Sequence, residues 1–182
     1  MTNVPLAPPH IEDDDITAVV DAIKGGWLAH GDMNKQFEQA FSDYIGQPHA
    51  VSLNSCTSAL DLALEVFDFP AGSEVIIPSF TWVSTGNVVL MNNLVPRFAD
   101  IKPDTFNMSI ESARAQINER TVAIIAVHFA GLPCDLQALK TLADDHNLIL
   151  IEDSAECLGG SWNGVMAGSI GLSCCRGMIL LI

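Results

Sequence analysis

The stretch of sequence that decides the fold is LILIEDSAECLGG, residues 148–160. Its first four residues are apolar without alternation, which predicts a strand buried on both faces, as in a parallel sheet covered by helices. Two acids, Glu152 and Asp153, end this run, and the residues after them have the composition of a loop. Because ligands of open α/β sheets bind at the carboxyl ends of the strands, Asp153 is a candidate to hold a cationic group.

The same alternation of apolar strand and amphipathic helix runs through most of the chain. Strands are expected at 50–53, 74–77, 95–99, 122–127 and 148–151, and helices at 58–67, 83–91, 110–117 and 136–146. This order implies right-handed crossovers and therefore an α/β fold with a mostly parallel sheet flanked by helices. Two further amphipathic helices come first, so we expect an N-terminal helical arm at residues 1–48 and an α/β domain at residues 49–182.

The composition excludes several classes of function. The 182 residues include 22 acidic and 8 basic side chains, a net charge of −14, whereas nucleic acids and anionic membranes require a basic surface. The chain does not open with a basic segment and an apolar core, and no apolar stretch approaches the ~20 residues of a membrane span. We therefore expect a soluble cytoplasmic protein. Its five cysteines form no CxxC pair, which favours free thiols over a metal site.

Residues 54–58, Asn-Ser-Cys-Thr-Ser, lie between the first strand of this domain and its helix. Small hydroxyl residues at a helix N-terminus can provide an anion site, and phosphate is its common occupant. The same residues also suit a plain N-cap, and the segment alone does not decide between the two. Neither GxxxxGK[ST] nor a GxGxxG after the strand is present, so the two common nucleotide-binding loops are not supported.

Two other strand ends carry side chains that could reach the same edge of the sheet. Trp82, in PSFTW, could cover a flat ring, although a tryptophan is more commonly a packing residue. His128, in VHFAG, could line the edge, but alone it indicates a hydrogen-bonded structural residue. Together, an anion site, an aromatic cover and a strand-end carboxylate suit a planar, cationic, phosphorylated ring. Pyridoxal phosphate is such a ligand, and Asp153 would keep its pyridine nitrogen protonated.

Six segments in unbroken order, from about residue 5 to residue 171, carry a resemblance to a known family. They are GGWLAHGDMNKQFEQAFSDYIG, NSCTSALDLAL, PSFTWVSTGN, PRFADIKPDTFNM, VHFAGLPCDL and IEDSAECLGGSWNG. In these segments the chain resembles the DegT/DnrJ/EryC1/StrS family, sugar aminotransferases of the fold-type I pyridoxal phosphate class. The resemblance implies transfer of an amino group from an amino acid, usually glutamate, to a nucleotide-linked keto sugar, for cell-surface polysaccharides or secondary-metabolite sugars. It also implies a homodimer in which both subunits build each site.

The resemblance implies roles for individual residues as well. Those expected at the cofactor are Cys56, Thr57, Ser58, Trp82, Asp153 and Glu156. The first three would hold the phosphate through amides and hydroxyls, Trp82 would stack on the ring, and Asp153 would meet the ring nitrogen. Glu156 would lie near the phenolic oxygen, where the family commonly has His or Gln. Trp27 and His30 would lie near the substrate, although His30 equally suits a surface loop.

The chain departs from the family after Gly171. Cys175 still fits, but residues 176–182, RGMILLI, do not, and the Schiff-base lysine of the family would fall near Ile182. No lysine follows Lys140. Our hypothesis is a changed reading frame near Leu172 followed by an early stop, with the rest of the large domain and the C-terminal small domain missing. We therefore expect the chain as written to be inactive in transamination.

Two other functions stay open at this point. A pyridoxal phosphate-dependent sugar dehydratase of the same superfamily would carry histidine where the aminotransferases carry the lysine. A non-catalytic remnant or binding module would have kept the scaffold and lost the chemistry, although Thr57, Trp82 and Asp153 are all still present.

Overall fold

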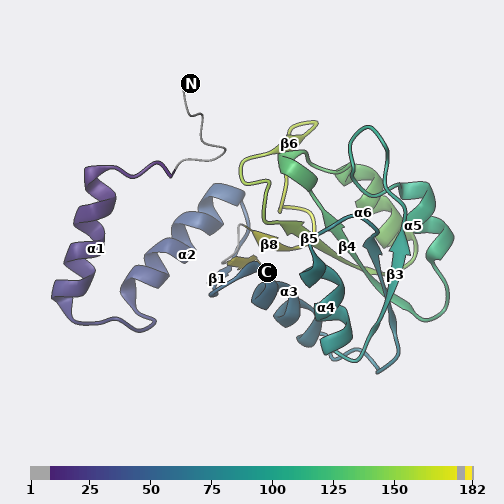
Figure 1. Cartoon of the computed structure of the whole chain (residues 1–182), viewed down its shortest axis with the longest axis horizontal. Helices are drawn as coiled ribbons and strands as arrows, with labels where there is room; N and C mark the ends of the chain where they lie inside the picture. Colours follow the sequence, from purple (N-terminus) through teal and green to yellow (C-terminus); the bar gives the residue numbers. More distant parts are fainter. Residues whose placement is uncertain (1–8, 176–178, 182) are drawn as a thin grey trace, which may run out of the picture. The chain divides into compact units, whose positions relative to one another are not determined.

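The computed structural model of the chain describes residues 9–175 and 179–181, and side chains as far as Leu172 (Figure 1). The position expected for the Schiff-base lysine, Ile182, and the side chains of Cys174 and Cys175 lie outside this description. The chain forms two compact units, residues 1–37 and residues 38–182.

Unit 1 contains α1 (Asp13–Gly25) and the start of α2 (Asp32–Ile45). The backbone N–H of Glu12 donates to the Asp15 carboxylate at 2.9 Å, as part of a capping box at the N-terminus of α1. Acids fill the first turn, where the helix dipole favours negative charge. Gly26 ends the helix with a φ of 74°, a left-handed conformation that glycine adopts without strain. Both helices that the sequence predicts before residue 48 are therefore present.

Unit 2 is built on a seven-stranded sheet with the order β1-β9-β8-β5-β4-β2-β3. Its strands are β1 (Ala50–Ser52), β2 (Glu74–Pro78), β3 (Val95–Ala99), β4 (Thr121–Val127), β5 (Ile149–Ser154), β8 (Leu172–Cys175) and β9 (Ile179–Leu181). The five strands from β8 to β3 run parallel, and only β9 is antiparallel to its neighbours, β8 and β1. The mostly parallel sheet predicted from the sequence is confirmed.

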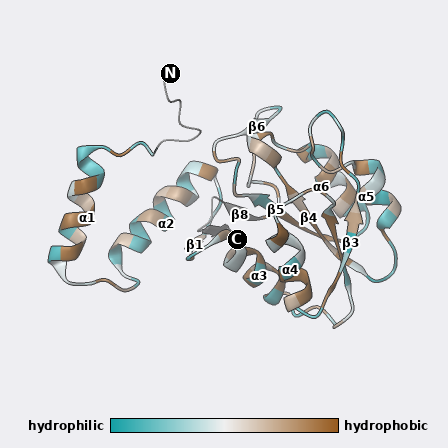
Figure 2. Cartoon of the chain, in the orientation of Figure 1, coloured by the Kyte–Doolittle hydropathy of each residue, from teal (hydrophilic) through white to brown (hydrophobic). Residues whose placement is uncertain are grey.

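Helices cover both faces of this sheet, each with its own apolar core. On one face α3 (Cys56–Glu65) and α4 (Val83–Met91) pack against residues such as Ile125 and Ile151. On the other face α5 (Ile110–Gln116) and α6 (Leu136–Asp145) pack against residues such as Ile124 and Leu150. Figure 2 shows the apolar colouring of the strands between these layers. Neighbouring residues of one strand thus enter different cores, as the alternation of side chains in a strand requires.

Three short elements complete unit 2. A 3-10 turn, η1 (Phe129–Gly131), follows β4 after one residue, His128. A two-stranded hairpin is formed by β6 (Ser161–Trp162) and β7 (Val165–Met166). Asn163 and Gly164 have φ values of 49° and 82° at its tip, which confirms the turn predicted from the Asn-Gly pair.

Two boundaries differ from the sequence prediction in a way that matters for the site. β5 continues to Ser154, so Glu152 and Asp153 lie within the strand and not beyond it. Because side chains alternate along a strand, the two acids point to opposite faces of the sheet. α3 begins at Cys56, two residues earlier than predicted, because the Ser55 side chain caps it. Cys56 and Thr57 therefore belong to its first turn.

Candidate cofactor site

A cavity of about 220 Å³ opens where β4 and β5 end, at the edge that the sequence predicted. Its lining residues are Phe80, Thr81, Trp82, Val127, His128, Phe129, Asp153, Ala155 and Glu156. Three residues expected at the cofactor, Trp82, Asp153 and Glu156, are therefore brought together from distant parts of the sequence. Crossovers at the carboxyl ends of parallel strands produce this convergence.

Asp153 is the charged group at the inner end of this site. Its side chain faces α3, and the Oδ1 atom accepts hydrogen bonds from the backbone N–H of Ala155 (3.2 Å) and the thiol of Cys56 (3.5 Å). Burial raises the pKa of Asp153 above its ordinary value, and these hydrogen bonds offset the rise only in part. A cation that enters the cavity would stabilise the ionised carboxylate.

Glu152, the adjacent residue, is fully buried on the other face and is satisfied by hydrogen bonds. Its carboxylate accepts the N–H groups of Gly168, Ile170 and Gly171 at 2.8–2.9 Å. His128 Nε2 lies 3.0 Å from Glu152 Oε2. Burial tends to raise the pKa of Glu152, but the hydrogen bond and charge of His128, together with the backbone donors, hold it below its ordinary value. Glu152 therefore ties residues 168–171 to the end of the strand.

His128 has the structural role that the sequence indicated for it when taken alone. It is fully buried, and its Nδ1 atom accepts the backbone N–H of Cys134 at 3.2 Å. In the neutral ring Nε2 therefore carries the proton and donates it to Glu152. Both ring nitrogens are used within the protein, so His128 contributes a wall of the cavity.

The first turn of α3 lies beside Asp153, as the contact of Cys56 with that residue shows. Ser55 caps the helix, and its Oγ accepts the N–H of Ser58 at 3.1 Å. The Ser58 hydroxyl donates to Asn54 Oδ1 at 2.8 Å. Thr57 is exposed. The N–H groups of a first helical turn have no partner within the helix, so this turn offers amide donors next to the carboxylate that could bind a cation.

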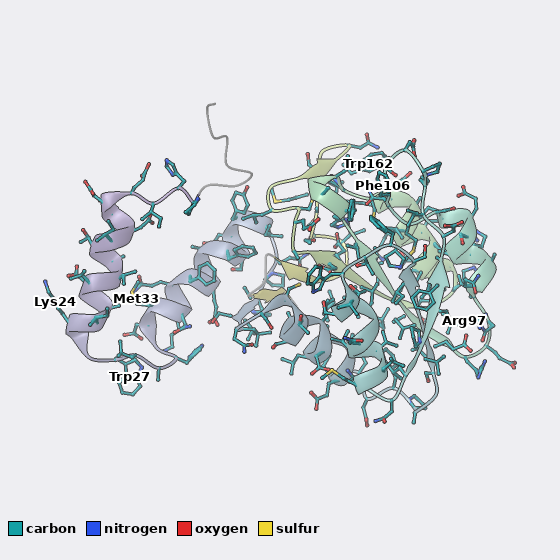
Figure 3. All side chains as sticks on the ribbon, viewed as in Figure 1. Lys24, Trp27, Met33, Arg97, Phe106 and Trp162 are labelled. Atoms are coloured by element: carbon teal, nitrogen blue, oxygen red, sulfur yellow. The ribbon has the colours of Figure 1, made fainter. Side chains whose placement is uncertain are left out.

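Aromatic side chains cover the cavity, and only one of them was singled out from the sequence. Trp82 is 77% exposed at the start of α4, so it is not the core residue that a tryptophan commonly is. Phe80 and Phe129 have ring centroids 5.0 Å apart, and Phe106, labelled in Figure 3, lies 5.6 Å and 5.9 Å from them. Phe106 has a φ of 60°, which no sequence signal predicted.

Glu156 has one carboxylate oxygen engaged in the wall of the site. Its Oε2 atom accepts the backbone N–H of Ala130 at 2.8 Å. Ala130 has a φ of 51°, a left-handed conformation that costs about 1 kcal/mol for a residue with a Cβ atom. The hydrogen bond stabilises the turn that carries Phe129, so Glu156 shapes the cavity as well as lining it.

Trp27 and His30 belong to unit 1. The indole N–H of Trp27 donates to the backbone carbonyl of His30 at 3.0 Å, and Trp27 itself is 70% exposed. A Cβ atom at Gly31 would approach the indole to 2.6 Å, so a larger residue there would displace the Trp27 side chain. Proximity of Trp27 and His30 to a substrate stays a prediction.

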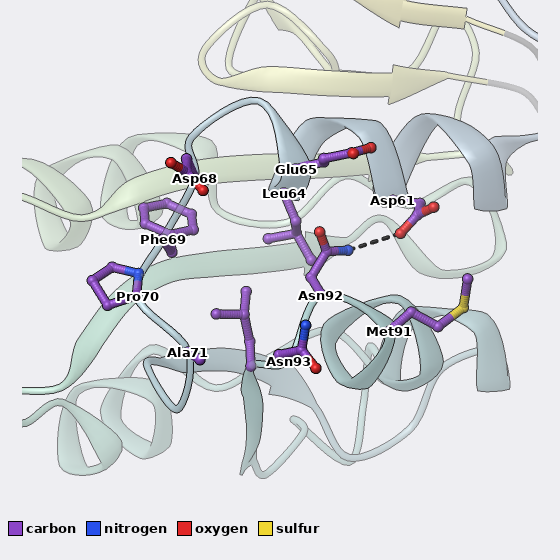
Figure 4. A pocket seen from close by; sticks show the side chains of 11 residues that line it. Asp61, Leu64, Glu65, Asp68, Phe69, Pro70, Ala71, Met91, Asn92 and Asn93 are labelled. Carbon is purple, nitrogen blue, oxygen red and sulfur yellow. Dashed lines mark hydrogen bonds between the residues drawn. The ribbon is translucent and has the colours of Figure 1, made fainter.

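A larger cavity, of about 670 Å³, lies at the ends of α3 and α4 and shares no residue with the first (Figure 4). Acids of α3 and the residues after it line one side, and Asn92 Nδ2 donates to Asp61 Oδ1 at 2.8 Å. Because helices of this fold begin near the carboxyl ends of the strands, the helix ends lie at the opposite edge from Asp153. Its larger volume therefore does not mark the ligand site.

Other kinds of site are not found among residues 9–175 and 179–181. No group of three or more His, Cys, Asp or Glu in that part of the chain could hold a metal ion. None of its helices combines the length and the hydropathy required to cross a membrane. The described cysteine side chains, Cys56, Cys134 and Cys157, form no disulfide with one another.

The fold matches that of solved pyridoxal phosphate-dependent aminotransferases over about half of their chains, with a TM-score of 0.91. The profile of the DegT/DnrJ/EryC1/StrS aminotransferase family matches residues 9–175, and the chain belongs to this family. Pyridoxal phosphate is the cofactor expected of it, since a solved relative is known in forms with pyridoxal and pyridoxamine phosphate.

Two curated relatives show the range of similar proteins. The spore coat polysaccharide biosynthesis protein SpsC of Bacillus subtilis is 38% identical over 168 residues, which are 92% of this chain and 43% of that protein. The GDP-perosamine synthase of Vibrio cholerae is 35% identical over 169 residues, 92% of this chain and 46% of that protein. The chain thus spans less than half of the length of the curated relatives that it matches.

Two solved structures show the same fold. The pyridoxal phosphate form of the sugar aminotransferase Spr1654 from Streptococcus pneumoniae has a TM-score of 0.91 at 31% identity, covering 99% of this chain and 53% of that chain. The GDP-4-keto-6-deoxy-D-mannose-3-dehydratase of E coli has a TM-score of 0.92 at 26% identity, covering 100% of this chain and 51% of that chain.

Proposed function

We propose that this chain is the cofactor-binding part of an aminotransferase that acts on nucleotide-linked keto sugars. The observation that carries the proposal is the state of Asp153. Its carboxylate is 6% exposed, it lines a cavity beside an exposed tryptophan, and it lies next to the first turn of a helix. A site for a planar ring with a cationic nitrogen and an anionic group requires these three features.

The described residues fit pyridoxal phosphate. Both hydrogen bonds to Asp153 end on Oδ1, and within the described part of the chain Oδ2 accepts none. An oxygen of this carboxylate that accepts no hydrogen bond from the described residues is available to a ligand, and the ring N–H⁺ is a donor that suits it. In this proposal the first turn of α3, with Cys56 and Thr57, supplies amide donors for the phosphate. The Ser58 N–H and hydroxyl, also expected there, donate to Ser55 and Asn54.

The other residues have supporting roles in this proposal. Trp82 covers a face of the ring, and its exposure leaves the indole surface available for stacking. Glu156 lies at the rim near the phenolic oxygen, with one of its oxygens held by Ala130. When bound, pyridoxal phosphate supplies an electron sink that stabilises a carbanion at the substrate carbon. Asp153 maintains this property because its negative charge keeps the ring nitrogen protonated.

The substrates and the assembly are parts of the same proposal. The GDP-perosamine synthase relative and the spore coat relative support a nucleotide-linked keto sugar as the amino acceptor and a role in polysaccharide formation. The amino donor is an amino acid, with glutamate as the first to test. A homodimer completes each site, with Trp27 and His30 near the substrate. We place this reaction in the cytoplasm.

We also propose that the 182-residue chain does not turn over by itself. Its four lysines are Lys24, Lys35, Lys102 and Lys140, and none of them is among the residues that line the cavity. Lys140 lies on α6 and pairs with Asp144. A covalent bond to the cofactor and the proton transfer that follows both require a nucleophilic amine in the site. Binding without turnover is therefore expected.

A pyridoxal phosphate-dependent sugar dehydratase is a second candidate, because the E coli dehydratase has the same fold with a TM-score of 0.92. The residues that bind the ring and the phosphate would serve either reaction. The residue at the lysine position separates the two, since the dehydratases resemble the family but carry histidine there.

The experiment is titration of the purified chain with pyridoxamine phosphate, followed by ligand fluorescence. This form carries its own amine and requires no lysine, so it tests the noncovalent site. We expect saturable binding at one site per chain, lost in Asp153→Asn and unchanged in Asp61→Asn, a matched change in the other cavity. Equal affinity in Asp153→Asn and the unmodified chain would contradict the proposal.

The proposal on turnover has a separate test. The chain is incubated with pyridoxal phosphate, glutamate and a nucleotide-linked 4-keto sugar, and the amino sugar is measured by mass spectrometry. No product beyond the background without protein is expected. More than one equivalent of amino sugar per chain would overturn the proposal that the chain does not turn over. Deoxygenated sugar formed from the same mixture would favour the dehydratase.

A further inference from the structure

The two oxygens of the Asp153 carboxylate are used differently. Oδ1 accepts the Ala155 N–H at 3.2 Å and the Cys56 thiol at 3.5 Å, whereas Oδ2 accepts no hydrogen bond within the described part of the chain. The Ala155 amide belongs to the backbone two residues further on. Among described side chains, Cys56 is therefore the one whose hydrogen bond to this carboxylate can be changed by substitution.

We propose that the Cys56 thiol is a positioning residue for the cofactor, because it holds Oδ1 of Asp153 and so directs Oδ2 towards the ring nitrogen. This inference rests on the proposed function and adds a role that a phosphate-binding amide would not have. The thiol lies in the first turn of α3, so one residue joins the carboxylate to the amides expected at the phosphate. The distance between the carboxylate that would bind the ring nitrogen and the amides that would bind the phosphate then depends on this contact.

Several factors besides the thiol determine the pKa of the Asp153 carboxylate. Burial has the largest effect and raises the pKa, while the hydrogen bonds from Ala155 and Cys56 lower it. The His128 ring, at the end of β4, also lowers the pKa, and Glu156, in the loop after β5, raises it. A donor to Oδ1 stabilises the ionised form, which is the form that binds a cationic ring nitrogen.

Loss of the thiol therefore has a specific consequence for the pH dependence of binding. In the unmodified chain, affinity for a ligand with a protonated ring nitrogen falls at acidic pH as Asp153 becomes neutral. Without the thiol donor, Asp153 becomes neutral at a higher pH, and the acidic fall in affinity moves in that direction. A hydroxyl donates more strongly than a thiol, so serine moves the fall to lower pH.

The test is the affinity for pyridoxamine phosphate as a function of pH for Cys56→Ala, Cys56→Ser and the unmodified chain. We expect Cys56→Ala to bind roughly threefold more weakly on the acidic side, the size of a weak hydrogen bond, and to recover at higher pH. In Cys56→Ser the fall in affinity should move to lower pH. Cys134→Ala is the matched control, because its buried thiol donates to the Val127 carbonyl and should leave the profile in place.

Each outcome decides between the two proposals. If the unmodified chain does not bind pyridoxamine phosphate at any pH, the proposed function fails and the role of Cys56 fails with it. If the chain binds, but both variants keep its pH profile, the proposed function stands and the positioning role is overturned. If Cys56→Ala does not fold, Cys56→Ser alone decides: a fall in affinity that moves to lower pH supports the positioning role, and an unchanged profile overturns it.

Discussion

Glu152 and Asp153 are adjacent in the sequence, and both carboxylates are buried, yet the protein treats them in opposite ways. Glu152 is fully buried on the side of α6 and accepts three backbone N–H groups and the His128 ring. Asp153 faces α3, has donors on one oxygen only and lines a cavity. A carboxylate with all its hydrogen bonds made within the protein stabilises structure. One with an oxygen left over is available to a ligand.

The electrostatic difference follows from this hydrogen bonding. Burial raises the pKa of both groups, but at Glu152 the donors outweigh burial and at Asp153 they do not. The direction of the pKa change therefore reports whether the protein or a ligand completes the environment of the carboxylate. Variants of the two residues are expected to separate stability from binding.

The largest effect is expected from Glu152→Ala. Removal of the acceptor leaves the His128 ring and three backbone N–H groups buried without a partner, which should cost about 3–5 kcal/mol of unfolding free energy. Denaturant unfolding measures the loss, with Glu65→Ala, at an exposed position of α3, as the control. A loss below about 1 kcal/mol would show that the network around Glu152 contributes little to stability.

Asp153→Asn should have the opposite pattern. The affinity for pyridoxamine phosphate should fall by at least about tenfold, because the ion pair with the ring nitrogen is lost. The unfolding free energy should stay equal or increase near neutral pH, since a buried charge without a full set of donors is removed. Titration and unfolding on the same samples check both results. A large loss of stability without a loss of affinity would show that Asp153, like Glu152, has a structural role.

The two carboxylates should also give opposite pH dependences of stability. The pKa of Glu152 is lower in the folded state, so its contribution is present above its unfolded pKa and is lost as pH falls through the folded pKa. The pKa of Asp153 is higher in the folded state, so its contribution is present below its unfolded pKa and is lost as pH rises through the folded pKa. The unfolding free energies of Glu152→Gln, Asp153→Asn and the unmodified chain are measured from about pH 3 to about pH 8, the range in which carboxylates titrate. The difference between each variant and the unmodified chain gives the contribution of that carboxylate. If both contributions change in the same direction with pH, the opposite roles assigned to Glu152 and Asp153 are contradicted.

The smallest change in stability is expected from Trp82→Ala. Because the indole is 77% exposed, the unfolding free energy should change by no more than about 0.5 kcal/mol. Affinity for pyridoxamine phosphate should nevertheless fall roughly fivefold, through loss of stacking on the ring. Met91→Ala, at an exposed position at the other end of α4, is the control. Unchanged affinity in Trp82→Ala would remove it from the cofactor site.

Much of this organisation could be predicted from sequence because it depends on local patterns. The apolar run before Glu152 predicted a buried strand, and the alternation of elements predicted a parallel sheet with ligands at one edge. The aromatic contacts of Phe106 with Phe80 and Phe129 were missed, because they join three loops and depend on a positive φ at Phe106.

The sequence by itself determined the fold class and the family, since periodicity and ordered motifs are properties of the chain. It also singled out Trp82, Asp153 and Glu156, which line one cavity. The tertiary structure decided which of two adjacent acids is available to a ligand. Extension of β5 to Ser154 sends Glu152 and Asp153 to opposite faces, and only packing shows that amides and His128 complete the hydrogen bonds of one of them. Hydrogen-bond satisfaction is set by groups distant in sequence, so residue type and spacing could not reveal it.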